Sequence, residues 1–191
     1  SMPITVSICG YALAAAIIFT YVGQSGEYAA AGYGAGTRIE QVVLLPILGI
    51  NTAIISIIAQ NYGAKNFNRI KETYITAIKY AFMIMVVSGI IVFILAGIIT
   101  RIFSSDPQVI EYGKRYLKIS AFVLPAYPVF FLSNGFFMAL KKSEMAMISN
   151  FFRNVLNPIV VFYIAKYINA SFSTFFWIWV GINWFFSISY F

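Results

Sequence analysis

The chain has 191 residues, of which 61% are hydrophobic and 10% charged, and its formal net charge is +7. Soluble domains typically carry about 25% charged residues, so this composition excludes a soluble globular protein and indicates a membrane protein. The basic residues are scattered between apolar runs, which favours charge that sets membrane orientation over a nucleic-acid-binding surface. We therefore expect the lipid bilayer as a partner and no nucleic acid.

The residue types also exclude several kinds of chemistry. Cys9 is the only cysteine and there is no histidine, which rules out an internal disulfide and argues against most transition-metal and histidine-based catalytic sites. No Gly-rich phosphate-binding loop precedes a Lys and a Ser or Thr, and no convincing nucleophile–base set is present. We therefore expect no enzyme, no ATP-driven pump, no metal site and no cofactor.

Six apolar segments are long enough to cross a membrane. A spanning helix needs about 20 mostly apolar residues, and open strands cannot satisfy their backbone groups in lipid. We therefore predict an all-α membrane protein with six transmembrane helices in one domain, residues 1–191. The predicted spans are residues 4–22, 30–61, 74–99, 117–140, 145–165 and 172–191. The first residues give no ordinary start and the last lie in an apolar run, so we expect a part of a longer protein.

Basic residues collect on one side of the predicted spans. Lys65, Arg69 and Lys71 follow the second span, and Lys141 and Lys142 follow the fourth. Cytoplasmic loops carry an excess of Lys and Arg. We therefore expect these two loops on the cytoplasmic side of a multi-pass protein in the cell (plasma or inner) membrane.

The second span contains an acid and a base. Arg38 and Glu40 are two positions apart and point about 200° apart around a helix, so they cannot neutralise each other. Burying such groups in lipid costs roughly 2.5–3.5 kcal/mol each, and they often mark function. A carboxyl group in a low-dielectric cavity can exchange a proton for a sodium ion near neutral pH. Coupling to such an ion and anchoring at the water interface are both compatible with this pair.

The same span contains helix-perturbing residues. Pro46 removes one helical hydrogen bond, and Gly49 adds flexibility nearby. Asn51 follows Glu40 by eleven positions, which places both near one face. The pattern predicts a broken helix with Glu40 and Asn51 on either side of the break, as in many transporter sites. Prolines that merely bend a membrane helix are the alternative.

The fourth span carries Tyr127, Phe131 and Asn134 at helical spacing. Aromatic rings and an amide suit a pocket for flat organic cations, although ordinary packing explains such a stripe as well. Pro125 and Pro128 lie within the span and predict a kink. Before it, residues 104–107 (Ser-Ser-Asp-Pro) are typical of a turn and a helix start.

The fifth span carries Asn150, Asn154 and Asn157 at i, i+4 and i+7, with Arg153 bordering that face. In lipid these amides must find partners inside the bundle. They predict either hydrogen bonds between helices or the lining of a polar cavity. Pro158 predicts a kink in this span.

Three segments resemble the multidrug and toxic compound extrusion (MATE) transporters: residues 33–40 (Tyr-Gly-Ala-Gly-Thr-Arg-Ile-Glu), 46–49 (Pro-Ile-Leu-Gly) and 60–65 (Gln-Asn-Tyr-Gly-Ala-Lys). The last segment is the most specific. The resemblance covers the whole chain, as the C-terminal six-helix lobe of a twelve-helix protein. It implies an N-terminal six-helix lobe as partner, and export of organic cations or drugs in exchange for sodium ions or protons by rocking of the two lobes.

The sequence departs from some branches of that family. Those branches carry one acid in the first helix of this lobe and another in the fourth. Here the first span has no acid before Glu27, and the fourth has none inside. Coupling in this lobe then falls to Glu40, or lies in the other lobe. A lipid-linked substrate flippase of the same superfamily and a non-transporting membrane assembly module are the alternative functions.

Overall fold

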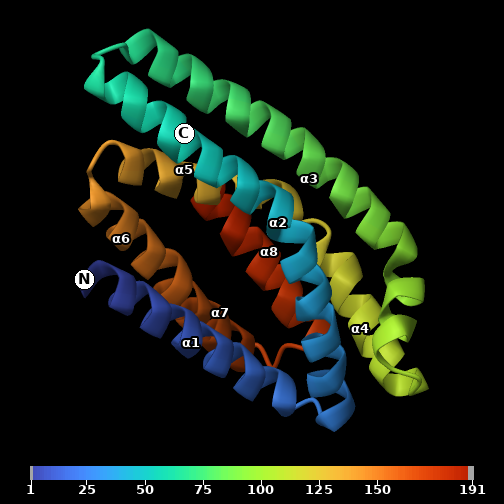
Figure 1. Ribbon diagram of the computed structural model, residues 1–191. Coiled ribbons are helices and arrows are strands. Elements are labelled where there is room, and N and C mark those ends of the chain that lie inside the picture. Colours follow the sequence, from blue (N-terminus) through green and yellow to red (C-terminus); the bar gives the residue numbers. More distant parts are fainter. Residues whose placement is uncertain (1, 189–191) are drawn as a thin grey trace.

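The computed structural model describes the backbone of residues 2–188 and the side chains of residues 12–188, and this part contains helices and loops but no strand. The predicted all-α fold class is therefore confirmed. The helices run back and forth along one direction and form one bundle (Figure 1). In chain order the elements are α1 (Met2–Gly23), α2 (Glu27–Gly63), α3 (Phe67–Phe103), α4 (Pro107–Ser120), η1 (Leu124–Ala126), α5 (Tyr127–Ala139), α6 (Ser143–Phe151), η2 (Phe152–Leu156), α7 (Asn157–Tyr167) and α8 (Phe172–Ile188).

Pro46 lies inside α2 without ending it. The helix is continuous over 37 residues, so the prediction that α2 is broken near Pro46 and Gly49 is wrong. The ribbon of α2 instead changes direction near its middle (Figure 1), as expected where a proline removes one backbone hydrogen bond. Pro46 and Gly49 are both exposed, and membrane helices tolerate such a bend when the freed backbone groups find other partners.

The fourth predicted span is a broken one, and the break lies where its prolines predicted a kink. α4 ends at Ser120, and the chain bends by 40° before α5 continues. Pro125 lies in the short 3₁₀ helix η1 and Pro128 in the first turn of α5. A proline in a first turn costs no helical hydrogen bond, so the two prolines permit a break followed by a new helix.

The helix that opens this span begins at Pro107, ten residues before the predicted start of the span at Leu117. The predicted helix start at residues 104–107 is confirmed, because the Asp106 side chain accepts hydrogen bonds from the N–H groups of Gln108 and Val109 at 2.7 and 3.3 Å.

The first turns of α4 are polar, and this hid them from a search for apolar segments. Glu111 lies 3.8 Å from the ammonium of Lys114 and 2.9 Å from the guanidinium of Arg115. Pairs at i+3 and i+4 support a helix whose surface faces water.

The fifth predicted span contains a π-helical turn. η2 separates α6 from α7, and Pro158 lies in the first turn of α7. A π turn changes the register that regular helical spacing assumes, and such turns often occur at functional sites. Asn154 and Asn157 are nevertheless buried and Asn150 is half-buried, so all three amides face the bundle.

Small residues bring α2, α3 and α4 close together. A β-carbon on Gly32 would lie 2.7 Å from the backbone nitrogen of Gly113, and one on Gly89 would lie 2.8 Å from the carbonyl oxygen of Ala121. In lipid, helices associate through such close backbone contacts rather than through the hydrophobic effect. α2 therefore packs along α3, α4 and α5, whereas α1 packs mainly against α6, η2 and α7.

The two basic loops lie at the same end of the bundle, between α2 and α3 and between α5 and α6 (Figure 1). Each contains a lysine in the left-handed conformation, Lys65 with φ 56° and Lys141 with φ 60°. In the first loop the N–H of Asn66 donates to the carbonyl of Asn61 at 2.9 Å, and the N–H of Lys65 donates to Tyr62 at 3.1 Å. These bonds close the end of α2 in a Schellman motif.

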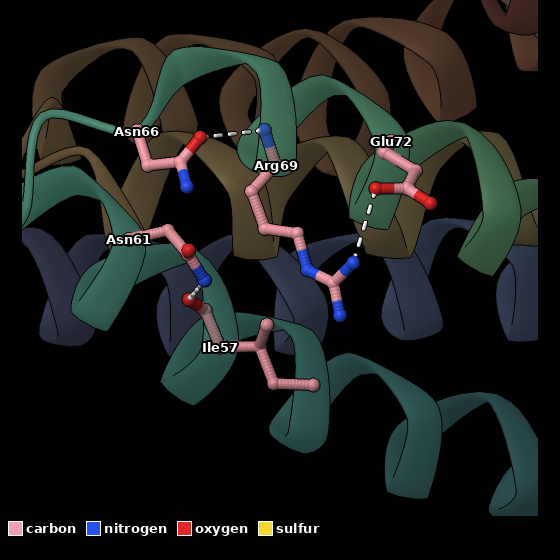
Figure 2. A network of polar contacts seen from close by, with 5 residues as sticks. All are labelled: Ile57, Asn61, Asn66, Arg69 and Glu72. Carbon is pink, nitrogen blue, oxygen red and sulfur yellow. Dashed lines mark hydrogen bonds and ion pairs between the residues drawn. The ribbon is translucent and has the colours of Figure 1, made fainter.

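Side chains complete this turn, as Figure 2 shows. The Asn66 side chain accepts a hydrogen bond from the N–H of Arg69 at 3.2 Å and so caps α3. Arg69 pairs with Glu72 at 3.2 Å, and the Asn61 amide donates to the carbonyl of Ile57 at 2.8 Å. The most specific of the three sequence segments therefore forms a tight turn between two long helices.

Candidate functional site

Glu40 is buried and bound by two tyrosines from other helices. Its side chain is 9% exposed. The hydroxyl of Tyr127 in α5 donates to Oε1 at 2.5 Å, and the hydroxyl of Tyr116 in α4 donates to Oε2. Each carboxylate oxygen thus has one donor, and Glu40 joins α2 to both halves of the broken span.

The local sequence explains why the two tyrosines reach Glu40. Gly36 lies one helical turn before Glu40, and a β-carbon there would clash with the ring of Tyr116. Tyr33 packs edge-on against the same ring, with centroids 5.1 Å apart. A glycine in α2 therefore makes room for the tyrosine that binds the glutamate.

Arg38 and Asn51 occupy different positions from Glu40. Arg38 is exposed, as expected for a residue that points about 200° away around the helix. Asn51 is half-buried against α5, where its Oδ1 atom leaves no room for a side chain on Gly135. This oxygen is buried and has no hydrogen-bond partner in the described part of the chain.

Arg153, in the π turn η2, lies over three aromatic rings. Its guanidinium carbon is 4.8, 3.8 and 5.4 Å from the ring centres of Tyr127, Phe130 and Phe131. Among the described residues no carboxylate lies within 4 Å of Arg153. The rings of Tyr127 and Phe131, which were predicted to suit an organic cation, thus carry the guanidinium of Arg153 in this structure.

The remaining predicted cavity residues are amides in the bundle. Asn134 is buried, and its amide donates to the carbonyl of Phe130 at 3.0 Å. Buried side-chain atoms of Asn134 (Oδ1), Asn154 (Nδ2) and Asn157 (Oδ1 and Nδ2) have no partner among the residues that the structure describes. Amides in lipid need partners, so both roles predicted for these residues, bonds between helices and the lining of a polar cavity, stay predictions.

A small cavity lies beside Glu40. Its volume is about 10 Å³, and Tyr116, Ser120 and Tyr127 also line it. The hydroxyl oxygen of Ser120 is buried and has no partner in the described part of the molecule. A cavity of this volume is at the lower limit for one water molecule, so the space admits a species the size of water and excludes a drug.

Sequence reasoning identified Glu40 but not its partners. Tyr116 and Tyr127 lie 76 and 87 positions away along the chain, and no local pattern connects them to Glu40. Ser120 was missed as well. Arg153 was noted only as a neighbour of the amide face. A tyrosine on either side of the break was the available signal.

A family profile described as MatE matches residues 3–164. The chain belongs to the MatE family. It is therefore a multi-pass protein of the cell membrane, in agreement with its long apolar helices.

Curated relatives support this assignment. The chain is 26% identical over 164 residues to the probable multidrug resistance protein YpnP of Bacillus subtilis, covering 86% of this chain and 34% of that protein. It is 31% identical over 107 residues to the FAD transporter of Shewanella oneidensis, covering 56% of this chain and 24% of the relative. It is 28% identical to the multidrug export protein MepA of Staphylococcus haemolyticus, and this match covers 69% of this chain and 29% of that protein. The chain thus spans about a third or less of the length of these relatives.

Solved structures share the fold. A crystal structure described as MATE in the straight conformation superposes with a TM-score of 0.91 at 21% identity, over 98% of this chain and 42% of that one. A second structure is a transporter of the MOP superfamily from Pyrococcus furiosus, described as having a binding pocket of reverse polarity. It superposes with a TM-score of 0.89 at 23% identity, over 99% of this chain and 43% of that one. The chain therefore has the fold of a little under half of each of these solved structures.

Proposed function

We propose that the protein of which this chain is one lobe is a secondary active exporter of drug-like organic compounds, driven by sodium ions or protons that bind at Glu40. The observation that carries the proposal is the setting of Glu40, a buried carboxylate bound by two neutral tyrosines rather than by a basic residue. The surrounding charged and titratable groups are Tyr116 on α4, Tyr127 on α5, Tyr33 on α2 and Arg153 on η2.

A buried carboxylate without a salt bridge is suited to coupling. Its charge is costly in lipid, and a proton or sodium ion would remove that cost. Loading would also change the hydrogen bonds to Tyr116 and Tyr127, which lie on either side of the break between α4 and α5. A ligand shifts a conformational equilibrium only through such a difference between the two states. Cation binding would in this way change the angle of the broken span and favour one orientation of the lobes.

The test uses Glu40→Gln in the complete protein, because this change keeps the shape of the side chain and removes its charge. In Glu40→Gln, efflux of a cationic dye from vesicles should fall at least tenfold and lose its pH or sodium dependence. Glu40→Asp should retain part of the efflux and part of this dependence. Glu27→Gln, an exposed acid in the first turn of the same helix, is the matched control. If Glu40 is only an anchor, Glu40→Gln will lower thermal stability and leave ion-dependent efflux per folded molecule unchanged, which would reject the proposal.

A second candidate substrate class is a flat compound that carries an anionic group. Arg153 presents a guanidinium beside three aromatic rings, a combination that suits stacking together with phosphate or carboxylate binding. The similarity to a relative named FAD transporter supports this candidate. Parallel efflux assays with a cationic dye and with a flavin nucleotide separate the two classes. Arg153→Gln should impair flavin efflux much more than dye efflux, measured per folded molecule, if Arg153 binds the anionic group.

A further inference from the structure

A long apolar groove runs between α3 and α8, on helices that hold neither Glu40 nor Arg153. One section has a volume of about 590 Å³ and is lined by residues of α3, the α4–α5 break and α8, including Phe93 and Trp177. A second section of about 400 Å³ continues along the same helices, and both sections are bordered by Pro125 and Trp184.

The break in the fourth span forms the floor of this groove. The indole of Trp184 donates to the carbonyl of Phe122 at 2.9 Å, and Trp177 packs on the Phe122 ring with centroids 5.3 Å apart. The Ser187 hydroxyl donates to the carbonyl of Ala126 at 3.2 Å. The polar side chains of Trp184 and Ser187 are thus paired with the backbone of the break, and the groove offers its occupant an apolar surface.

Two lysines lie beside the groove. Lys79 borders the second section, and the Lys118 ammonium lies 5.2 Å from the centre of the Phe93 ring in the first section. Among the described residues, no carboxylate lies within 4 Å of Lys79. Within the part of the chain that the structure describes, its ammonium therefore has no counter-ion at the mouth of the groove.

The position of Lys79 along α3 places it at the edge of the hydrocarbon. Residues 80–100 of α3 contain no charged residue, and about 20 apolar residues cross a bilayer. From Lys79 to Ile94 the helix rises about 22 Å at 1.5 Å per residue. One leaflet of the hydrocarbon core is about 15 Å thick, so the groove is long enough for one acyl chain whose headgroup lies at Lys79.

We propose that the groove between α3 and α8 binds an anionic phospholipid, with one acyl chain in the groove and the phosphate headgroup on Lys79. The apolar lining fits the chain and excludes a polar substrate. The unpaired ammonium at the hydrocarbon edge selects negative charge, because lysines near a membrane surface attract anionic lipids. Val180 lines both the groove and the small cavity beside Glu40, so a bound chain would support the wall behind the glutamate. The inference does not rest on the proposed transport function.

The groove tryptophans provide a direct test on the complete, delipidated protein in detergent. Phosphatidylglycerol with brominated acyl chains should quench tryptophan fluorescence at about a fivefold lower concentration than phosphatidylcholine with the same chains, since one lysine contributes about that factor. Replacing Trp177 and Trp184 by Phe should remove this high-affinity quenching.

Two matched pairs of variants keep the test independent of folding defects. Lys79→Gln should make the two lipids equivalent, whereas Lys71→Gln, an exposed lysine outside the groove on the same helix, should change nothing. Ile90→Phe fills the groove and should weaken quenching, whereas Ile91→Phe, which is equally on the surface of α3 but outside the groove, should not. Equal quenching by the two lipids, equal effects within either pair, or no quenching because the rest of the protein covers the groove would overturn the proposal.

Discussion

The guanidinium carbon of Arg153 lies 3.8 Å from the centre of the Phe130 ring. The same group lies 4.8 Å from the centre of the Tyr127 ring, and the Tyr127 hydroxyl donates to Glu40. One tyrosine thus connects a positive and a negative side chain that come from η2 and α2. The charge on Arg153 and the hydrogen bonding of Glu40 are therefore coupled through a single ring.

This connection predicts that Arg153→Gln lowers stability and shifts the pH or sodium dependence of efflux. Loss of the cation–π contacts should cost about 1–2 kcal/mol of unfolding free energy. Arg153→Lys should lose less of this unfolding free energy than Arg153→Gln but still some of it, because an ammonium lacks the planar stacking surface. Thermal unfolding and efflux at several pH values measure the two effects. Lys166→Gln, at the exposed end of α7, is the control, and an equal effect of both substitutions would refute the connection.

Tyr116→Phe and Tyr127→Phe each remove one donor from Glu40. A hydrogen bond to a charged group contributes about 1.5–3 kcal/mol, so each variant should unfold at a lower temperature if Glu40 is ionised in the folded protein. The double variant should differ from the sum of the single variants, because both donors bind one carboxylate. Tyr80→Phe, on an exposed position of α3, controls for loss of a hydroxyl. Single variants as stable as Tyr80→Phe would indicate that Glu40 does not depend on these donors.

The sequence predicted the features that depend on local chemistry. Glu40 was identified because a charge in an apolar run is costly, and a kink in the fourth span was predicted from Pro125 and Pro128. The start of α4 at Pro107 was not assigned to that span, since the pairs of Glu111 with Lys114 and Arg115 made the first turns polar.

Features that depend on distant contacts could not be predicted. Pro46 suggested a broken helix, but packing along α3, α4 and α5 keeps α2 continuous. The partners of Glu40 depend on how α2 crosses the broken span. The placement of Arg153 over the rings of α5 depends on the π turn, which regular spacing does not reveal.

The left-handed lysine in the loop after α2 predicts a stabilising substitution. Lys65 has φ 56°, a conformation that costs an ordinary residue about 1–2 kcal/mol and costs glycine almost nothing. Lys65→Gly should therefore raise the unfolding free energy by up to about 1 kcal/mol, since glycine also loses more entropy on folding. Lys142→Gly is the control. Lys142 has φ −99°, which an ordinary residue adopts without strain, so this variant should be less stable than the parent protein. The measurement is thermal unfolding of the purified proteins. A lower unfolding temperature for Lys65→Gly than for the parent protein would contradict the prediction.

Two glycines two positions apart on α2 test whether close helix packing stabilises the lobe. A β-carbon on Gly32 would lie 2.7 Å from the Gly113 nitrogen and 2.8 Å from the Val109 carbonyl oxygen, whereas one on Gly34 would meet nothing within 4 Å. The atoms near Gly32 belong mostly to the backbone of α4 and cannot rotate away. Gly32→Ala must therefore push α2 and α4 apart, which typically costs about 1–3 kcal/mol.

Gly34→Ala provides the matched control, because it makes the same chemical change without the clash. Alanine favours a helix over glycine by up to about 1 kcal/mol, so this variant should be as stable as the parent or more stable. Compared with the parent protein in the same detergent, Gly32→Ala should consequently unfold at a lower temperature, and Gly34→Ala at the same or a higher temperature. Separation of α2 from α4 would also move Tyr116 relative to Glu40, so Gly32→Ala, unlike Gly34→Ala, should reduce ion-dependent efflux. Equal unfolding temperatures for the two variants would mean that the approach of α2 to α4 at Gly32 does not determine the stability of the lobe.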